Sequence, residues 1–199
     1  MGKREQAGGG EMSRAAVFLD RDGVLNRAFV RAGKPYPPQT LEEFEILPGV
    51  EAAARLLKGE GFALVVATNQ PDVAKGTQRR EGVEAMHERL RSRLPLDGIK
   101  VCWCVEGPDC ECYKPKAGLL LDAADELGLD LKRSFMVGDR WRDVGAGRNA
   151  GCFTILIDRG YDEALRETPD AVCADLPEAA AVILARSRGA QAGAKEARR

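Results

Sequence analysis

The chain alternates between apolar runs of strand length and segments with helical periodicity. The runs are continuously apolar rather than alternating with polar residues, which is typical of strands that are buried on both faces of a parallel sheet. We therefore predict strands at residues 15–20, 62–69, 99–105, 134–139 and 152–158, with a weaker sixth strand at 171–174.

Helical patterns lie between these runs, at residues 50–58, 78–94, 118–127 and around 144–150. In the second of these helices, Val83, Met86, Leu90 and Leu94 recur at helical spacing and form one apolar stripe. The chain's single histidine, His87, stands beside that stripe, and we expect it on the helix surface. The alternation of strands and helices predicts an α/β fold, a three-layer α/β/α sandwich around a parallel Rossmann-like sheet. Ligands of such sheets bind beyond the carboxyl ends of the strands.

The length of 199 residues fits one domain, which we place at residues 14–184. Residues 1–13 are rich in glycine and charge, and residues 185–199 are low in complexity, so we expect flexible tails at both ends. No apolar run approaches the roughly 20 residues of a membrane span, and the N-terminus lacks the apolar core of a signal peptide. We therefore expect a cytoplasmic protein, a monomer or weak oligomer, with its six cysteines reduced and no membrane partner.

Composition adds one exclusion. Apolar residues make up 44% of the chain and charged residues 31%, with a net charge of -1. Such a chain has no excess of basic residues to neutralise the phosphates of a nucleic acid, so we expect no nucleic-acid partner.

Polar side chains gather where the predicted strands end. Asp20 and Asp22 follow the first strand, Thr68 and Asn69 close the second, and Asp139 closes the fourth. Asp143 follows one helical turn later, and Lys114 is expected to begin a helix with Pro115 in its first turn. In a parallel sheet these groups converge on one edge, where several carboxylates raise one another's pKa unless a cation is present. A hard divalent ion such as Mg²⁺, which keeps waters and binds phosphate oxygens, fits this set.

These residues predict phosphoryl transfer. Asp20 would attack phosphorus and form an aspartyl-phosphate, while Asp22 would protonate the leaving oxygen and later deprotonate the attacking water. Lys114 and Thr68 would stabilise charge on the phosphoryl oxygens. The Mg²⁺ ligands would be Asp20, Asp139 and the backbone carbonyl of Asp22, with Asp143 supporting them from the rim.

A second cluster consists of two Cys-x-Cys pairs at residues 102–112, followed two residues later by Lys114. Disulfides within such pairs are disfavoured because neighbouring side chains point apart along an extended chain. Four thiolates complete a tetrahedral Zn²⁺ site and leave no position open for a substrate. We therefore predict a structural zinc loop with the ligands Cys102, Cys104, Cys110 and Cys112. Cys152 and Cys173 stand in apolar runs and are expected in the core.

The motifs FLDRDGVLN, ATNQ, YKPK and GDRWRDVGAGRNAG resemble those of the haloacid dehalogenase superfamily over about residues 15–160. Asp22 places the chain on the phosphatase side of that superfamily, because true dehalogenases lack the second aspartate. The spacing of the motifs leaves no room for a separate cap domain, so we expect a capless, open site.

Within the superfamily the chain is most similar to the D-glycero-D-manno-heptose 1,7-bisphosphate phosphatases and to the histidinol-phosphatases, which carry a comparable zinc loop. The resemblance implies a phosphatase acting on a small phosphorylated metabolite, with heptose bisphosphate as the first candidate substrate and histidinol phosphate as the alternative. Two departures bear on the substrate. Tyr113 replaces the usual arginine of heptose-bisphosphate phosphatases, and the segment 27–40 is longer than the usual loop.

The candidate substrate contacts are Asn69, Gln70, Tyr113 and Arg140. Arg31 and Lys34 join Arg140 as possible cations for a second phosphate. Two other classes of function remain open: a zinc-stabilised binding module with a degenerate site, which would need a missing nucleophile or lysine, and a nucleic-acid 3′-phosphatase, which the near-zero net charge disfavours.

Overall fold

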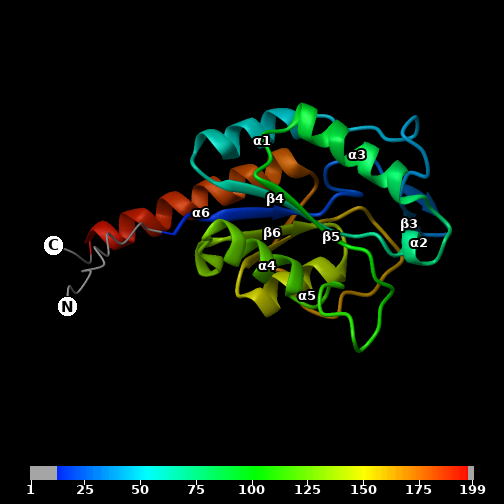
Figure 1. Ribbon diagram of the computed structural model, residues 1–199. Coiled ribbons are helices and arrows are strands. Elements are labelled where there is room, and N and C mark those ends of the chain that lie inside the picture. Colours follow the sequence, from blue (N-terminus) through cyan, green and yellow to red (C-terminus); the bar gives the residue numbers. More distant parts are fainter. Residues whose placement is uncertain (1–12, 197–199) are drawn as a thin grey trace, which may run out of the picture.

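The computed structural model describes residues 13–196, and its centre is a parallel sheet of six strands (Figure 1). The strands are β1 (Ala16–Leu19), β4 (Ala63–Asn69), β5 (Gly98–Cys102), β6 (Phe135–Gly138), β7 (Phe153–Ile157) and β8 (Ala171–Cys173). They lie in the order β5-β4-β1-β6-β7-β8, and each neighbouring pair is parallel. The six predicted strands and the Rossmann-like topology are confirmed.

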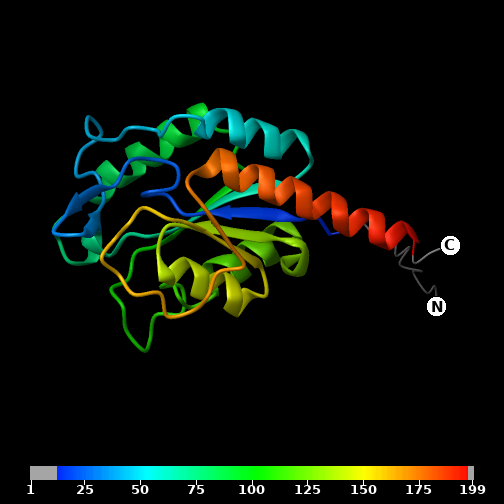
Figure 2. The same cartoon turned by 180° about the vertical axis from the view of Figure 1, so that it is seen from behind.

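Helices cover both faces of the sheet, as predicted (Figures 1 and 2). One face is covered by α1 (Val50–Gly59), α3 (Arg80–Arg93) and α6 (Leu176–Glu196), and the other by α4 (Gly118–Leu127) and α5 (Trp141–Ala150). Two short elements, α2 (Pro71–Ala74) and the 3₁₀ turn η1 (Leu131–Arg133), complete the connections. No helix among residues 13–196 is long and apolar enough to cross a membrane.

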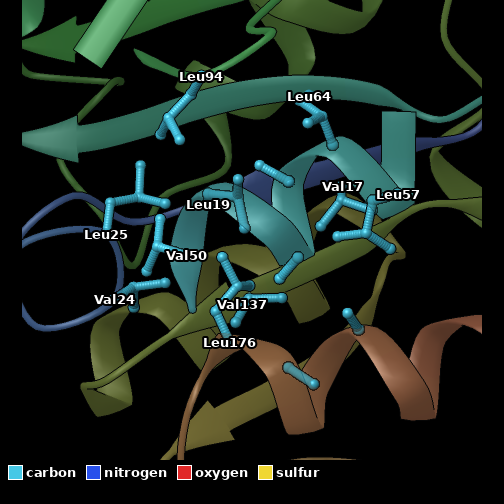
Figure 3. Packing of buried hydrophobic residues seen from close by; sticks show 14 of the residues in the cluster. Val17, Leu19, Val24, Leu25, Val50, Leu57, Leu64, Leu94, Val137 and Leu176 are labelled. Atoms are coloured by element: carbon cyan, nitrogen blue, oxygen red, sulfur yellow. The ribbon is translucent and has the colours of Figure 1, made fainter. Parts of the chain in front are cut away.

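The inner strands β1, β4 and β6 are buried along nearly their whole length because their successive side chains enter two different cores. In β1, Val17 and Leu19 pack with α1, α3 and α6, whereas Ala16 and Phe18 pack with α4 and α5. Figure 3 shows the first of these cores, in which the side chains of β1 meet those of α1, β4 and α6. Every residue of β1 is fully buried, so the carboxyl end of this strand is held firmly where Asp20 follows it.

The long segment 27–40 forms a small hairpin of β2 (Phe29–Arg31) and β3 (Lys34–Tyr36). Ala32 and Gly33 both have positive φ at its turn. The turn lies against the loop after β7, because the Asp162 N–H donates to the carbonyl of Gly33 at 2.9 Å. A Cβ on Gly33 would lie 2.7 Å from Cβ of Asp162, so the contact requires glycine there. The hairpin is a two-stranded sheet separate from the six-stranded one, and residues 13–196 form no separate cap domain.

The structure corrects four local expectations. His87 is 3% exposed and therefore lies in the interior, not on the surface of α3. Lys114 does not begin a helix, because α4 starts only at Gly118 and Lys114 belongs to the preceding turn. Helix α5 starts at Trp141, earlier than expected.

The fourth correction concerns the C-terminal tail. Helix α6 continues to Glu196, well beyond residue 185, where we expected a flexible segment to begin. Its low-complexity sequence is rich in alanine and arginine, which are strong helix formers, and Arg188 forms an ion pair with Glu60 at the end of α1. The predicted tail at residues 1–13 falls almost entirely outside the described residues.

Candidate active site

The site lies where the strand order reverses, at the carboxyl ends of the neighbouring strands β1 and β6. Asp20 follows β1 and Asp139 follows β6, and the Asp20 N–H donates to the carbonyl of Val137 at 2.9 Å. One carboxylate oxygen from each of Asp20, Asp139 and Asp143 lies within 4.8 Å of the others. These groups line a pocket of about 240 Å³, whose walls also include the β2–β3 hairpin and the turn before α4.

Lys114 lies beneath this carboxylate cluster and uses all three of its N–H donors. Its Nζ donates to Asp20 Oδ1 at 2.8 Å, to Asp143 Oδ1 at 2.5 Å and to the carbonyl of Ala67 at 2.7 Å. Burial alone would lower the pKa of Lys114, but the charges of Asp143 and Asp20 raise it above the ordinary value of a lysine. The lysine is therefore a fixed cation within the site.

Asp143 lies deeper in the site than the sequence led us to expect. We predicted a supporting residue at the rim, but the side chain is buried, accepts from Lys114 and also accepts from the N–H of Arg140 at 3.0 Å. Gly138 makes this position accessible, because a Cβ there would lie 2.0 Å from Cβ of Asp143. The first turn of α5 therefore folds back onto the end of β6 and carries Asp143 to the lysine.

The cluster has the chemistry of a divalent-cation site. Burial raises the pKa of Asp20 to about 6, with Lys114 opposing and Asp143 reinforcing the shift. Burial and the charges of Asp20 and Asp143 hold the pKa of Asp139 well above its usual range. Asp139 Oδ2 accepts from the Tyr161 hydroxyl at 2.8 Å, but its buried Oδ1 has no hydrogen-bond partner. A cation such as Mg²⁺ would satisfy this oxygen and favour the ionised carboxylates, so the residues present fit the metal.

Gly23 is part of the same arrangement. Its φ is 87°, and a Cβ would lie only 1.8 Å from Asp139 Oδ2. Glycine after Asp22 thus lets the chain turn away from β1 while Asp139 approaches its backbone.

Asp22 is held by donors on several sides. Arg21 places Nε and Nη2 against both of its carboxylate oxygens at 2.9–3.2 Å, Asn26 Nδ2 donates at 2.9 Å, and Gln70 Nε2 donates at 3.0 Å. Gln70 also donates to Thr68 Oγ1 at 3.0 Å, which links the ends of β1 and β4. Sequence reasoning did not identify Arg21 or Asn26. The signal for Arg21 was an arginine between the two aspartates that follow a fully apolar strand.

The four candidate substrate contacts, Asn69, Gln70, Tyr113 and Arg140, all line the pocket. Asn69 is engaged with the turn that carries the lysine, because it accepts from Lys114 N at 3.1 Å and donates to Lys114 O at 3.2 Å. The Arg140 guanidinium is paired with Glu163, which sequence reasoning missed. Asn69 and Arg140 are therefore positioned by the protein before any ligand binds.

The cations predicted on the long loop lie elsewhere. Arg31 and Lys34 are not among the pocket residues, and the Arg31 guanidinium lies 5.6 Å from the ring centroid of Tyr36. Besides Lys114 and Arg140, the pocket is lined by two cations that sequence reasoning missed, Lys75 and Arg142.

Arg142 joins the pocket to the cysteine loop. Its guanidinium lies 5.3 Å from the ring centroid of Tyr113 and 4.5 Å from that of Trp141. It also forms a bidentate ion pair with Glu106, with both N–O distances at 2.8 Å. Tyr113 thus has an arginine stacked upon it.

The four cysteines of the loop converge on one point. They are free, and the nearest Sγ–Sγ distances are 3.5 Å for Cys102–Cys110 and Cys110–Cys112 and 3.8 Å for Cys104–Cys112. All four sulfurs lie within 4.8 Å of one another. Tetrahedral Zn²⁺ with Zn–S bonds of about 2.3 Å separates its sulfurs by about 3.8 Å, so the geometry fits zinc. Cys152 and Cys173, which lie outside the loop in sequence, are buried in the core as expected.

Comparison with known proteins identifies the same family. A HAD-hydrolase-like family model matches residues 111–179. A D-glycero-D-manno-heptose-1,7-bisphosphate 7-phosphatase of Thermosynechococcus vestitus is 36% identical over 191 residues, which cover 84% of this chain and 94% of the relative. A D-glycero-beta-D-manno-heptose-1,7-bisphosphate 7-phosphatase of Pseudomonas aeruginosa is 38% identical over 155 residues, covering 75% of this chain and 84% of the relative.

A solved structure agrees with these relatives. The crystal structure of D,D-heptose 1.7-bisphosphate phosphatase from B. bronchiseptica, complexed with magnesium and phosphate, is 30% identical to this chain. It superposes with a TM-score of 0.72 and covers 86% of this chain and 99% of its own. The chain therefore belongs to the heptose-bisphosphate phosphatase family of the HAD-like hydrolases, and it is a phosphatase.

Proposed function

We propose that the chain is a Mg²⁺-dependent phosphatase whose substrate is D-glycero-D-manno-heptose 1,7-bisphosphate. The observation that carries the proposal is the cluster of Asp20, Asp139 and Lys114 at the switch point of the sheet, in a chain whose relatives are named for this substrate. Asp20, Asp139 and the backbone carbonyl of Asp22 would hold Mg²⁺. When bound, the ion supplies positive charge to the phosphoryl oxygens.

Asp20 attacks phosphorus in line. The phosphoryl group passes from the sugar oxygen to a carboxylate oxygen of Asp20 and forms an aspartyl-phosphate. Lys114, a buried cation that cannot readily lose its proton, neutralises charge that develops on the transferring group. Thr68, at the end of β4, contributes its hydroxyl to the same oxygens.

Asp22 moves the protons in both half-reactions. It protonates the leaving alkoxide in the first step and deprotonates the water that releases phosphate in the second. Its side chain is oriented for this by Arg21, Asn26 and Gln70, and it lines the pocket beside Asp20.

The four cysteines of the loop would hold Zn²⁺, and the ion would supply folding free energy rather than chemistry. Four thiolates would leave no ligand position of the ion open for the substrate. Lys114 follows Cys112 by two residues, and fixing the loop fixes the start of the turn that delivers the lysine.

A second phosphate is the feature that favours heptose bisphosphate over histidinol phosphate. The pocket lining includes Lys75, Arg140 and Arg142, each of which would share its present carboxylate partner, Asp72, Glu163 or Glu106, with an additional anion. Histidinol phosphate carries a protonated amine instead of a second phosphate, so it offers these donors no acceptor. A nucleic-acid 3′-phosphatase remains the least supported alternative, because the chain carries a net charge of -1. Zinc binding without catalysis would require a missing nucleophile or lysine, and both are present.

The test is a phosphate-release comparison between heptose 1,7-bisphosphate and histidinol phosphate, with Mg²⁺ added after chelation. The bisphosphate should have the higher kcat/KM, and Asp20→Asn should abolish release from both substrates while the circular dichroism spectrum is unchanged. Faster turnover of histidinol phosphate would replace the proposed substrate, and substantial activity in Asp20→Asn would overturn the mechanism. The expected monomer or weak oligomer and the cytoplasmic location stay predictions, which sedimentation and cell fractionation can check.

A further inference from the structure

Arg21 is a fully buried arginine beside the candidate nucleophile. It is 0% exposed and lies between Asp20 and Asp22 in the sequence. A guanidinium has five N–H donors and no acceptor, and it is costly to bury unless those donors are used. The hydrogen-bond partners of Arg21 therefore indicate which residues its guanidinium positions.

Two of the three guanidinium nitrogens face Asp22. Nε and Nη2 each lie 2.9–3.2 Å from both carboxylate oxygens, in a two-point contact that fixes the plane of the carboxylate. The third nitrogen, Nη1, lies 3.3 Å from Nε2 of His87. His87 thus takes one of the three N–H donors that Asp22 leaves over.

The protonation state of His87 follows from this contact. Since arginine only donates, Nε2 must accept, so the ring is neutral and carries its proton on Nδ1. Burial and the charge of Arg21 lower the pKa of His87 to about 3, in agreement with a neutral ring. The ring is also packed from the side of the cysteine loop, because the Trp103 ring centroid lies 6.4 Å away, between two of the cysteines in sequence.

We propose that His87 is a positioning residue for Asp22, which it orients by accepting a hydrogen bond from Arg21. Helix α3 carries no residue of the carboxylate cluster, yet through His87 it holds the guanidinium against Asp22. The inference rests on the acid–base role proposed above for Asp22. It makes His87, which does not line the pocket, a determinant of proton transfer.

The test compares two substrates of nearly the same shape, phenyl phosphate and 4-nitrophenyl phosphate, by their kcat/KM. This parameter reports the step that breaks the ester bond. Phenoxide needs a proton to leave, whereas nitrophenolate leaves readily without one. Loss of general-acid catalysis therefore slows the first substrate selectively, while a general loosening of the fold slows both.

His87→Leu removes the acceptor, and we expect it to lower kcat/KM about tenfold on phenyl phosphate but less than about threefold on 4-nitrophenyl phosphate, a fraction of a full general-acid effect. His87→Gln, whose amide oxygen stands near the position of Nε2, should restore most of the loss. If His87→Leu does not fold, His87→Asn replaces it, because its shorter amide oxygen does not reach Nη1.

Equal losses on the two substrates, or no rescue by glutamine, would show that His87 is only a packing contact and would overturn the proposal. Asp22→Asn distinguishes failure of the acid role of Asp22 from failure of the positioning role of His87. If Asp22→Asn slows both substrates equally, the acid role of Asp22 fails and the inference fails with it. If Asp22→Asn slows phenyl phosphate more than 4-nitrophenyl phosphate but His87→Leu does not, only the role of His87 fails.

Discussion

Lys114 Nζ lies 2.8 Å from Asp20 Oδ1, although 94 residues separate the two in the sequence. Both side chains are buried, and the same ammonium also binds Asp143. This one cation therefore compensates two carboxylates that the fold has removed from water.

Replacing Lys114 by methionine should affect both activity and stability. Phosphate release should fall about 10²–10³-fold, because the transferring group loses a fixed cation. The free energy of unfolding in the absence of divalent ions should fall by about 3–5 kcal/mol, because a buried ion pair loses one partner. Phosphate-release assays and urea unfolding measure the two effects. Lys132→Met, at an exposed lysine of η1, is the matched control and should resemble the wild type.

The cysteine loop should bind one zinc per chain. Cys110→Ala should lose the metal and unfold at a lower temperature, since structural zinc contributes folding free energy outright. Elemental analysis and thermal unfolding are the measurements. Cys152→Ala removes a thiol buried in the core, outside the loop, and should retain its zinc. Purified wild-type protein with well under one zinc per chain would contradict the assignment.

Tyr161 should tune the magnesium site without touching the ion. Its hydroxyl donates to Asp139 Oδ2, and the buried Oδ1 of the same carboxylate has no hydrogen-bond partner. Tyr161→Phe should raise the Mg²⁺ concentration for half-maximal activity about 10–100-fold, the usual effect of losing such a supporting contact. A Mg²⁺ titration of activity measures this. Tyr36→Phe, on the hairpin, should leave the half-activation concentration unchanged.

His87 should make the protein sensitive to acid. Its pKa is about 3 in the folded state against 6.5 for an ordinary histidine. As the pH falls from 6.5 toward 3, the unfolded chain binds a proton that the folded chain does not, so the free energy of unfolding decreases. Above pH 6.5 both states are neutral and the effect is absent.

The full effect is on the order of 5 kcal/mol, comparable with the total stability of many domains. Urea unfolding between pH 7 and pH 4 should therefore show a steep loss of stability in the wild type and a shallower one in His87→Gln. Carboxylates contribute to the pH dependence of unfolding in both proteins. The difference between the two slopes therefore gives the contribution of His87. Identical slopes would place His87 in contact with water.

Arg142 should recognise the second phosphate. Arg142→Gln should raise KM for the bisphosphate by about tenfold, the effect of one charge-assisted contact, and should change KM for a sugar monophosphate much less. Steady-state kinetics on both substrates checks this. Arg31→Gln removes a cation that does not line the pocket, and it should leave both KM values unchanged. If Arg31→Gln raises KM for the bisphosphate and Arg142→Gln does not, the second phosphate binds at the hairpin instead.

Much of the fold was readable from local patterns. Each buried strand is a continuous apolar run, and the alternation with helices predicted a parallel sheet whose carboxyl ends gather Asp20, Thr68 and Asp139. The spacing of the four cysteines likewise predicted one compact cluster, because ligands so close in sequence need little help from the rest of the fold.

Contacts between segments that are distant in the sequence could not be predicted from local patterns. His87 stands beside the apolar stripe of its helix, and only the packing of α3 over the end of β1 turns it inward toward Arg21. Asp143 has the spacing of a rim residue, but the close approach at Gly138 brings it to Lys114.

The chain by itself determined the sheet, the carboxylates at its edge and the cysteine loop, because these depend on periodicity and short spacing. The tertiary structure alone decided which charges pair, which cations reach the pocket, and how Asp22 is held. Those outcomes depend on side chains brought together across tens of residues, where burial sets the strength of each interaction and sequence separation carries no information about it.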